Sequence, residues 1–167
     1  MNSSKIDFTG QDLYIGIDTH ARQWKITVRT RSTALRTLSI NPKPKDLYTF
    51  LNNHYPGARY NSVYEAGFCG FWIHRQLLEY GINNIIVNAA DIPTAHKEKD
   101  RKDDKVDSRK LARELSKGNL IAIYVPAERE QQLRSLCRLR SKIVQNRIRV
   151  QNRIKSHLYF NGIDLPS

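Results

Sequence analysis

The sequence predicts an α/β protein with one mixed β-sheet, flanking helices and a long C-terminal helix. Three observations lead to this prediction. Residues 1–40 contain three strand-like segments joined by short polar connections, which is typical of an antiparallel meander. Strand-like and helix-like segments then alternate, which favours parallel pairing in the rest of the sheet. Finally, neither Pro nor Gly interrupts the helical pattern over residues 127–161.

The opening meander is expected over residues 13–40. Residues 13–18 form an apolar run typical of a buried strand, and residues 23–29 alternate polar and apolar side chains like a half-exposed strand. The short linker at residues 19–22 indicates a hairpin, and therefore antiparallel pairing. Residues 35–40 can supply the third strand.

Further strands are expected over residues 60–65 and 82–87, with a short last strand over 120–125, and helices over residues 46–54, 71–80 and 105–117. Pro42 and Pro44 mark the start of the first of these helices, because Pro is favoured just before and just inside a helix. Gly81 and Gly118 are placed to end the other two.

The last helical segment, which Pro126 opens and which runs to about Phe160, is strongly basic. Nine Lys and Arg residues face only two Glu residues there, and apolar side chains at 136, 143 and 150 repeat every seven residues. We therefore expect three parts: a loose N-terminus (1–11), an α/β catalytic domain (12–125) and a long helix (126–162) for dimerisation and nucleic-acid contact. The predicted nucleic-acid-binding residues are Arg134, Arg138, Arg140, Lys142, Arg147, Arg149, Arg153 and Lys155.

The composition favours a polyanionic partner. The formal net charge is +12 at pH 7 over 167 residues, which is typical of nucleic-acid-binding proteins. Cys69 and Cys137 form no CxxC pair, which argues against a zinc site and a disulfide framework and fits a reducing cytoplasm. No signal peptide and no apolar run of about 18 residues is visible, so no membrane partner is expected.

Four acidic residues form the candidate catalytic and metal site. Asp18 and Glu65 each end a strand-like run, and Asp104 and Asp107 lie three residues apart at the head of a helix, on one helical face. Carboxylates at the ends of buried strands are costly unless a cation compensates them. Mg²⁺, or Mn²⁺ in its place, prefers such oxygen ligands and acts on phosphates.

Other interpretations of these acidic residues stay open from the pattern alone. Asp18 can cap the following turn, Glu65 can be a surface charge, and either helical Asp can be a first-turn acid that the helix dipole favours. Asp103 competes with Asp104, because Asp103 and Asp107 also share a helical face. His20, two residues after Asp18, is an exposed turn histidine or a contact to substrate or metal.

Three segments carry a family resemblance: YIGIDTH at residues 14–20, YEAG at 64–67 and KDDKVDSRKLA at 102–112. Together they resemble the N-terminal DEDD domain of the insertion-sequence transposases related to the Piv and MooV DNA invertases, the bridge-RNA-guided recombinases. The resemblance implies a RuvC-like, ribonuclease-H-type fold and a divalent-metal tetrad at Asp18, Glu65, Asp104 and Asp107.

The same resemblance implies DNA strand cleavage and exchange and a structured guide RNA. The seven-residue apolar repeat of the long helix, in turn, predicts a homo-oligomer. Family members continue into a second domain with a serine that resembles a covalent nucleophile. This chain stops at Ser167, which lacks that motif, so we expect an isolated catalytic domain that is inactive alone.

Three alternatives to a transposase domain remain at this stage. A stand-alone metal-dependent nuclease, such as a Holliday-junction resolvase, would use the same acidic residues with water as the nucleophile. A non-catalytic RNA-binding dimerisation module would need only the basic helix. A sugar-kinase or actin-like ATPase is disfavoured, because no glycine follows Asp18 to make the phosphate-binding turn.

Overall fold

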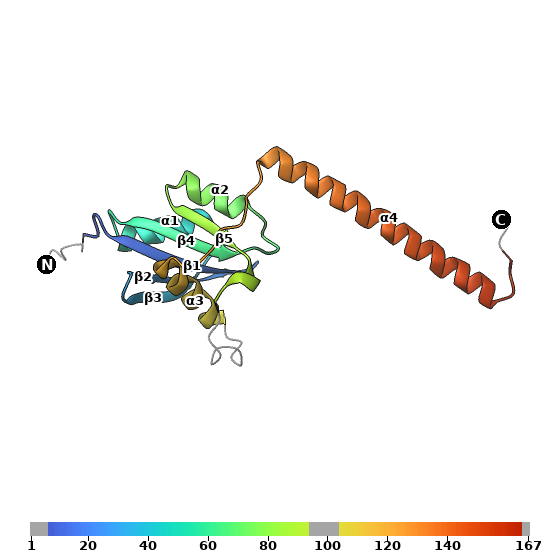
Figure 1. Ribbon diagram of the computed structural model, residues 1–167, viewed down its shortest axis with the longest axis horizontal. Helices are drawn as coiled ribbons and strands as arrows, with labels where there is room; N and C mark the ends of the chain where they lie inside the picture. The colour runs from blue at the N-terminus through green and yellow to red at the C-terminus, as the bar shows by residue number, and fades with distance from the viewer. Residues whose placement is uncertain (1–6, 94–103, 165–167) are drawn as a thin grey trace. The chain divides into compact units, whose positions relative to one another are not determined.

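The computed structural model of the chain describes residues 7–93 and 104–164, and its description of side chains resumes at Ser108. The chain divides into two compact units, Met1–Val125 and Pro126–Ser167. The first is a sheet flanked by helices, and the second contains one long helix (Figure 1). Among the helices in the described ranges, none combines the length and apolar character that crossing a membrane requires.

The strands of the first unit form one mixed sheet in the order β3-β2-β1-β4-β5. Their bounds are β1 Asp12–Thr19, β2 Trp24–Arg29, β3 Ala34–Ile40, β4 Arg59–Glu65 and β5 Asn83–Val87. The first three strands pair antiparallel, whereas β4 is parallel to β1 and β5 is parallel to β4. The structure therefore confirms the predicted α/β sheet, with a meander followed by parallel strands.

The helices agree with the predicted elements to within one or two residues. Their bounds are α1 Pro44–His54, α2 Trp72–Glu79, α3 Asp104–Lys117 and α4 Glu128–Phe160, with a short 3₁₀ turn at Ala89–Asp91. The buried side chains of α1 and α2 join the main core on one face of the sheet. α3 contributes Leu111 to a second, smaller cluster with Val63 and Val87 on the opposite face.

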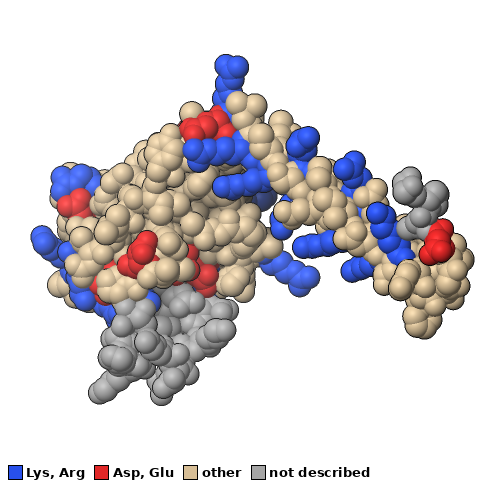
Figure 2. Space-filling view, turned by 45° about the vertical axis from the view of Figure 1, so that its right-hand side comes forward, with Lys and Arg blue, Asp and Glu red and all other residues tan. Residues whose placement is uncertain are grey.

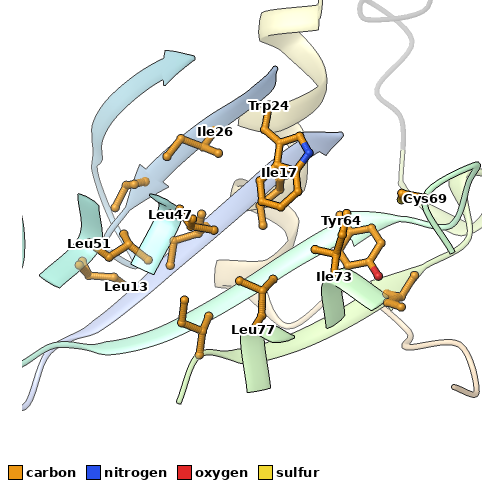
Figure 3. Packing of buried hydrophobic residues seen from close by; sticks show 14 of the residues in the cluster. Leu13, Ile17, Trp24, Ile26, Leu47, Leu51, Tyr64, Cys69, Ile73 and Leu77 are labelled. Atoms are coloured by element: carbon orange, nitrogen blue, oxygen red, sulfur yellow. The ribbon is translucent and has the colours of Figure 1, made fainter. Parts of the chain in front are cut away.

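β1 is the central strand of the sheet and has elements packed on both of its faces. Leu13, Ile15 and Ile17 are fully buried and meet Leu47 of α1 and Leu77 of α2 in the main core (Figure 3). Since side chains alternate along a strand, the residues between them face α3. Asp18 is therefore on the α3 face of the sheet, together with Gly16.

The predicted last strand at residues 120–125 is not a strand in the structure. The described residues there form only an isolated antiparallel bridge between Ala122 and Val87, and the backbone amide of Ile123 donates to the carbonyl of Ile86 at 2.8 Å. Ile123 and Val125 pack against the core, but Tyr124 is 70% exposed. Apolar contacts of Leu120, Ile123 and Val125 and a single bridge, rather than a hydrogen-bond ladder, hold this segment beside β5.

A buried carboxylate forms a hydrogen-bond network at the C-terminal end of α3. Glu114 has a side chain only 5% exposed and accepts hydrogen bonds from Asn119 at 2.9 Å, Arg113 at 2.9 Å and Lys117 at 3.3 Å. Burial raises the pKa of Glu114, but these hydrogen bonds lower it further, so the net pKa is below the usual value. The charged carboxylate therefore stabilises the folded state.

Replacing Glu114 by Gln is expected to lower the free energy of unfolding by about 1–3 kcal/mol at neutral pH, because a buried charge-assisted network is broken. The folded pKa lies below the unfolded one, so this stabilisation is present above the unfolded pKa and is lost as pH falls through the folded pKa. Denaturant unfolding from pH 7 to pH 3 should bring wild type and variant together. Glu79→Gln, at an exposed position, is the control, and an equal gap at both pH values contradicts the assignment.

Candidate metal centre

Two of the predicted acidic residues meet at the ends of adjacent strands. Ile17 of β1 pairs with Tyr64 of β4 in parallel register, so the next residues along, Asp18 and Glu65, are neighbours on the same face of the sheet. Both line one cavity of about 140 Å³. The full lining is Ile17, Asp18, Thr19, Glu65, Ala66, Gly67, Phe68 and Leu111.

A glycine brings α3 against this end of the sheet. A Cβ atom on Gly16 would lie 2.1 Å from the carbonyl oxygen of Ser108 and 2.5 Å from the amide nitrogen of Ala112. Only a residue without a side chain permits this approach of helix backbone to strand. The same packing places Leu111 in the wall of the cavity, and the Ser108 hydroxyl bonds Thr27 of β2 at 3.0 Å.

The helical periodicity of α3 places the two predicted acidic positions on the same face as Leu111. Positions 104 and 107 precede Leu111 by seven and four residues, so all three share one helical face. The structure describes Asp104 and Asp107 as helical but does not describe their side chains, and Asp103 lies outside the described residues. Among the side chains that are described, no group of three or more Asp, Glu, His and Cys residues is arranged to hold a metal ion.

Asp18 has a polar environment that the sequence only partly indicates. Its carboxylate is 17% exposed and is 3.1 Å from the Nε2 atom of His20, whose side chain is 49% exposed. His20 therefore contacts Asp18. On the other side, Lys25 of β2 is the cross-strand partner of Asp18, a relation that the hairpin register fixes and that sequence reasoning missed.

The loop after Glu65 is held by a buried tyrosine. The Tyr64 hydroxyl donates to the carbonyl of Gly70 at 3.0 Å and accepts from the amide of His74 at 3.3 Å. Burial raises the pKa of Tyr64 far above its usual value, so the hydroxyl stays protonated as a donor. These bonds tie the C-terminal end of the loop and the first turn of α2 to the core, and Phe68, which lines the cavity, is 73% exposed.

The mixed sheet, with helices on both faces and carboxylates at the ends of β1 and β4, defines a RuvC-like α/β domain of the ribonuclease-H type. Residues 15–161 match the family model described as Transposase, that of the IS110-type DEDD transposases. Because the match covers most of the chain, the chain belongs to this family of transposases. The family resemblance of the three sequence segments is thereby confirmed.

A relative of known name agrees with this assignment. The chain is similar to the inferred transposase y4rJ of Sinorhizobium fredii, with 36% identity over 107 residues. The matched region is 60% of this chain and 27% of that protein. The chain thus spans about a quarter of the length of the relative that it matches.

Proposed function

We propose that this chain supplies the metal-binding part of a transposase that cleaves and exchanges DNA strands. The observation that supports the proposal best is that Asp18 and Glu65, at the ends of neighbouring strands, line one cavity together with Leu111 of α3. Two carboxylates on neighbouring strands are the donor set that a hard divalent cation such as Mg²⁺ prefers. Asp104 and Asp107, on the helical face of Leu111, would complete the tetrad.

Each acidic residue has a distinct task in this proposal. Asp18 and Glu65 would provide carboxylate oxygens from the rigid sheet, and Asp104 and Asp107 would provide them from α3. A bound divalent cation would stabilise the charge that develops on the scissile phosphate. His20, in contact with Asp18, would help to fix that carboxylate in one orientation.

In this proposal the nucleophile and the target selection would come from outside the tetrad. In the proposal, the serine nucleophile belongs to the second domain that family members carry, and a structured guide RNA selects the DNA target. Strand cleavage would therefore need the tetrad and that second domain together, so the tetrad alone is expected to bind metal without cutting DNA.

The long helix α4 would bind nucleic acid and a second copy of the chain. It contains no buried residue in the isolated chain, and Lys and Arg side chains stand along its length (Figure 2). Leu136, Ile143 and Val150 are 62%, 59% and 51% exposed and recur every seven residues. Such a stripe is what a coiled-coil partner buries, whereas the basic side chains suit a phosphate backbone.

The metal site is tested by calorimetric titration of Mn²⁺ or Mg²⁺ into the chain with DNA present. We expect Asp18→Asn and Asp104→Asn each to weaken metal affinity at least tenfold, because each removes a charged ligand, and Asp103→Asn to have little effect. Asp91→Asn, an exposed carboxylate on the 3₁₀ turn, is the matched control.

The titration also separates the competing functions. If no substitution changes metal uptake, the metal site is wrong and the chain is a nucleic-acid-binding module only. If the wild-type chain cuts branched DNA by itself with Mg²⁺, it acts as a stand-alone nuclease and needs no serine domain. Metal uptake that depends on Asp18 and Asp104, without cleavage by the chain alone, supports the transposase proposal.

A further inference from the structure

The register of the strands places further polar side chains beside the two acidic residues. On the α3 face, Ser39 of β3 pairs with Lys25 of β2, Lys25 pairs with Asp18 of β1, and Asp18 neighbours Glu65 of β4. The face is fixed by Thr27, two residues after Lys25, whose hydroxyl bonds Ser108 of α3. One straight row across the sheet therefore joins a hydroxyl, an ammonium and the two carboxylates.

Lys25 is placed to act beside the cavity. Directly opposite residues of an antiparallel pair have Cβ atoms about 5 Å apart, so the Lys25 ammonium can reach an anion held at Asp18. Lys25 is only partly exposed, and its strand is buried through Trp24 and Ile26 on the other face. This rigid setting keeps the lysine stem next to the acidic pair.

The row of residues leads into a groove at the same end of the sheet. This hairpin groove has a volume of about 460 Å³ and is lined by Arg22, Gln23, Ser39, Ile40, Asn41 and Asp46. Its wall at the β1–β2 connection carries Arg22. Its α1 wall carries Asp46, which accepts a hydrogen bond from Asn41 at 2.9 Å, so Arg22 is the cation and Asp46 the anion of the lining.

The span from the cavity to the groove matches a nucleic-acid backbone. Ser39 and Asp18 are two strands apart, which is about 10 Å at the usual strand spacing of ~4.8 Å. Successive phosphates of one DNA strand advance about 3.4 Å along the helix axis and lie farther apart than that along the backbone, so the span covers fewer than three nucleotides. A phosphate at the acidic pair would thus have neighbours beside Lys25 and Arg22.

We propose that the DNA strand held at the Asp18–Glu65 cavity continues over Lys25 into the hairpin groove. Lys25 contacts the phosphate next to the cavity, and Arg22 contacts one farther along. The assignment rests on the proposed function, because it places the scissile phosphate at the acidic pair. It adds a phosphate-binding track that fixes the path of the strand on the catalytic domain.

The test measures binding of a short fluorescent DNA duplex to the full chain as a function of salt. Lys25→Ala and Arg22→Ala are each expected to reduce the slope of log affinity against log salt by about 1, and the double variant by about 2. Arg31→Ala, in the exposed turn between β2 and β3 at the opposite end of β2, is the matched control and should leave the slope unchanged.

The outcomes separate this track from the proposed function. Slopes equal to wild type in all three variants overturn the track, even where metal uptake still depends on Asp18. The same titration is repeated with an RNA duplex of the same sequence. If Lys25→Ala and Arg22→Ala reduce the slope only for the RNA, the groove holds RNA and the DNA assignment is wrong. If Asp18→Asn leaves metal uptake intact, the metal-site proposal fails, whatever Lys25 and Arg22 do.

Discussion

Gly16→Ala is expected to lower the free energy of unfolding of the first unit by about 3 kcal/mol, the upper end of the usual cost of overpacking. The new Cβ would collide with two backbone atoms of α3, at 2.1 Å from the Ser108 oxygen and 2.5 Å from the Ala112 nitrogen. Backbone atoms in a packed helix have no rotamer to change, so α3 must move away from β1. For a unit of this size the melting temperature should fall by roughly 10 °C.

Thermal and denaturant unfolding followed by circular dichroism measure this loss. Gly67→Ala is the control, because the nearest atom to its added Cβ is the Glu65 oxygen at 3.9 Å. The Gly16 variant should also bind Mn²⁺ more weakly, since α3 carries Asp104 and Asp107. A Gly16 variant as stable as the Gly67 variant would falsify the close packing of α3 on β1.

Neutralising one face of α4 should have the largest effect on nucleic-acid affinity. Arg134, Arg138, Lys142, Arg149 and Arg153 follow one another at four- and seven-residue steps and so share a helical face. With about 0.9 counterions released per phosphate contact, five Gln replacements should reduce the salt slope by about 4.5. Between 50 and 200 mM salt, wild-type affinity should therefore fall roughly 500-fold more than that of the variant.

Fluorescence titration of a DNA duplex and a structured RNA across this salt range measures the two slopes. The matched control replaces Gln145 and Asn152, uncharged residues of the same face, by Ala. Circular dichroism verifies that the helix persists in both variants. If the quintuple variant keeps the wild-type slope, the contacts lie elsewhere and the basic helix has another role.

The sequence predicted the fold well because its local signals agree with one another. The hydrophobic periods separate strands from helices, and the Gly and Pro positions mark most boundaries to within two residues. The exception is residues 120–125, where an apolar pattern reflects contacts of Ile123 and Val125 with the core rather than a ladder. A short apolar segment does not itself reveal whether its backbone finds a partner strand.

The candidate site was predicted in part. Asp18 and Glu65 were identifiable because each ends an apolar strand, and the parallel order of those strands implies that their ends coincide. Lys25 was missed, because a linker at residues 19–22 places Gln23 opposite Asp18, whereas in the structure Thr19 pairs with Trp24 and Asp18 therefore pairs with Lys25. The groove at Arg22 and Asn41 leaves no sequence signal, because its walls come from three separate segments.

The sequence by itself determined the strands, the helices, the positions of the acidic residues and the membership of a transposase family. Those properties depend on local periodicity and on short motifs, which can be identified in the sequence without knowing which segments pack together. Only the tertiary structure decided that α3 lies against β1 at Gly16, that Lys25 stands between Asp18 and Ser39, and that the row ends in a groove. These relations depend on strand register and on the fit of helix backbone to strand, which arise when distant segments pack together.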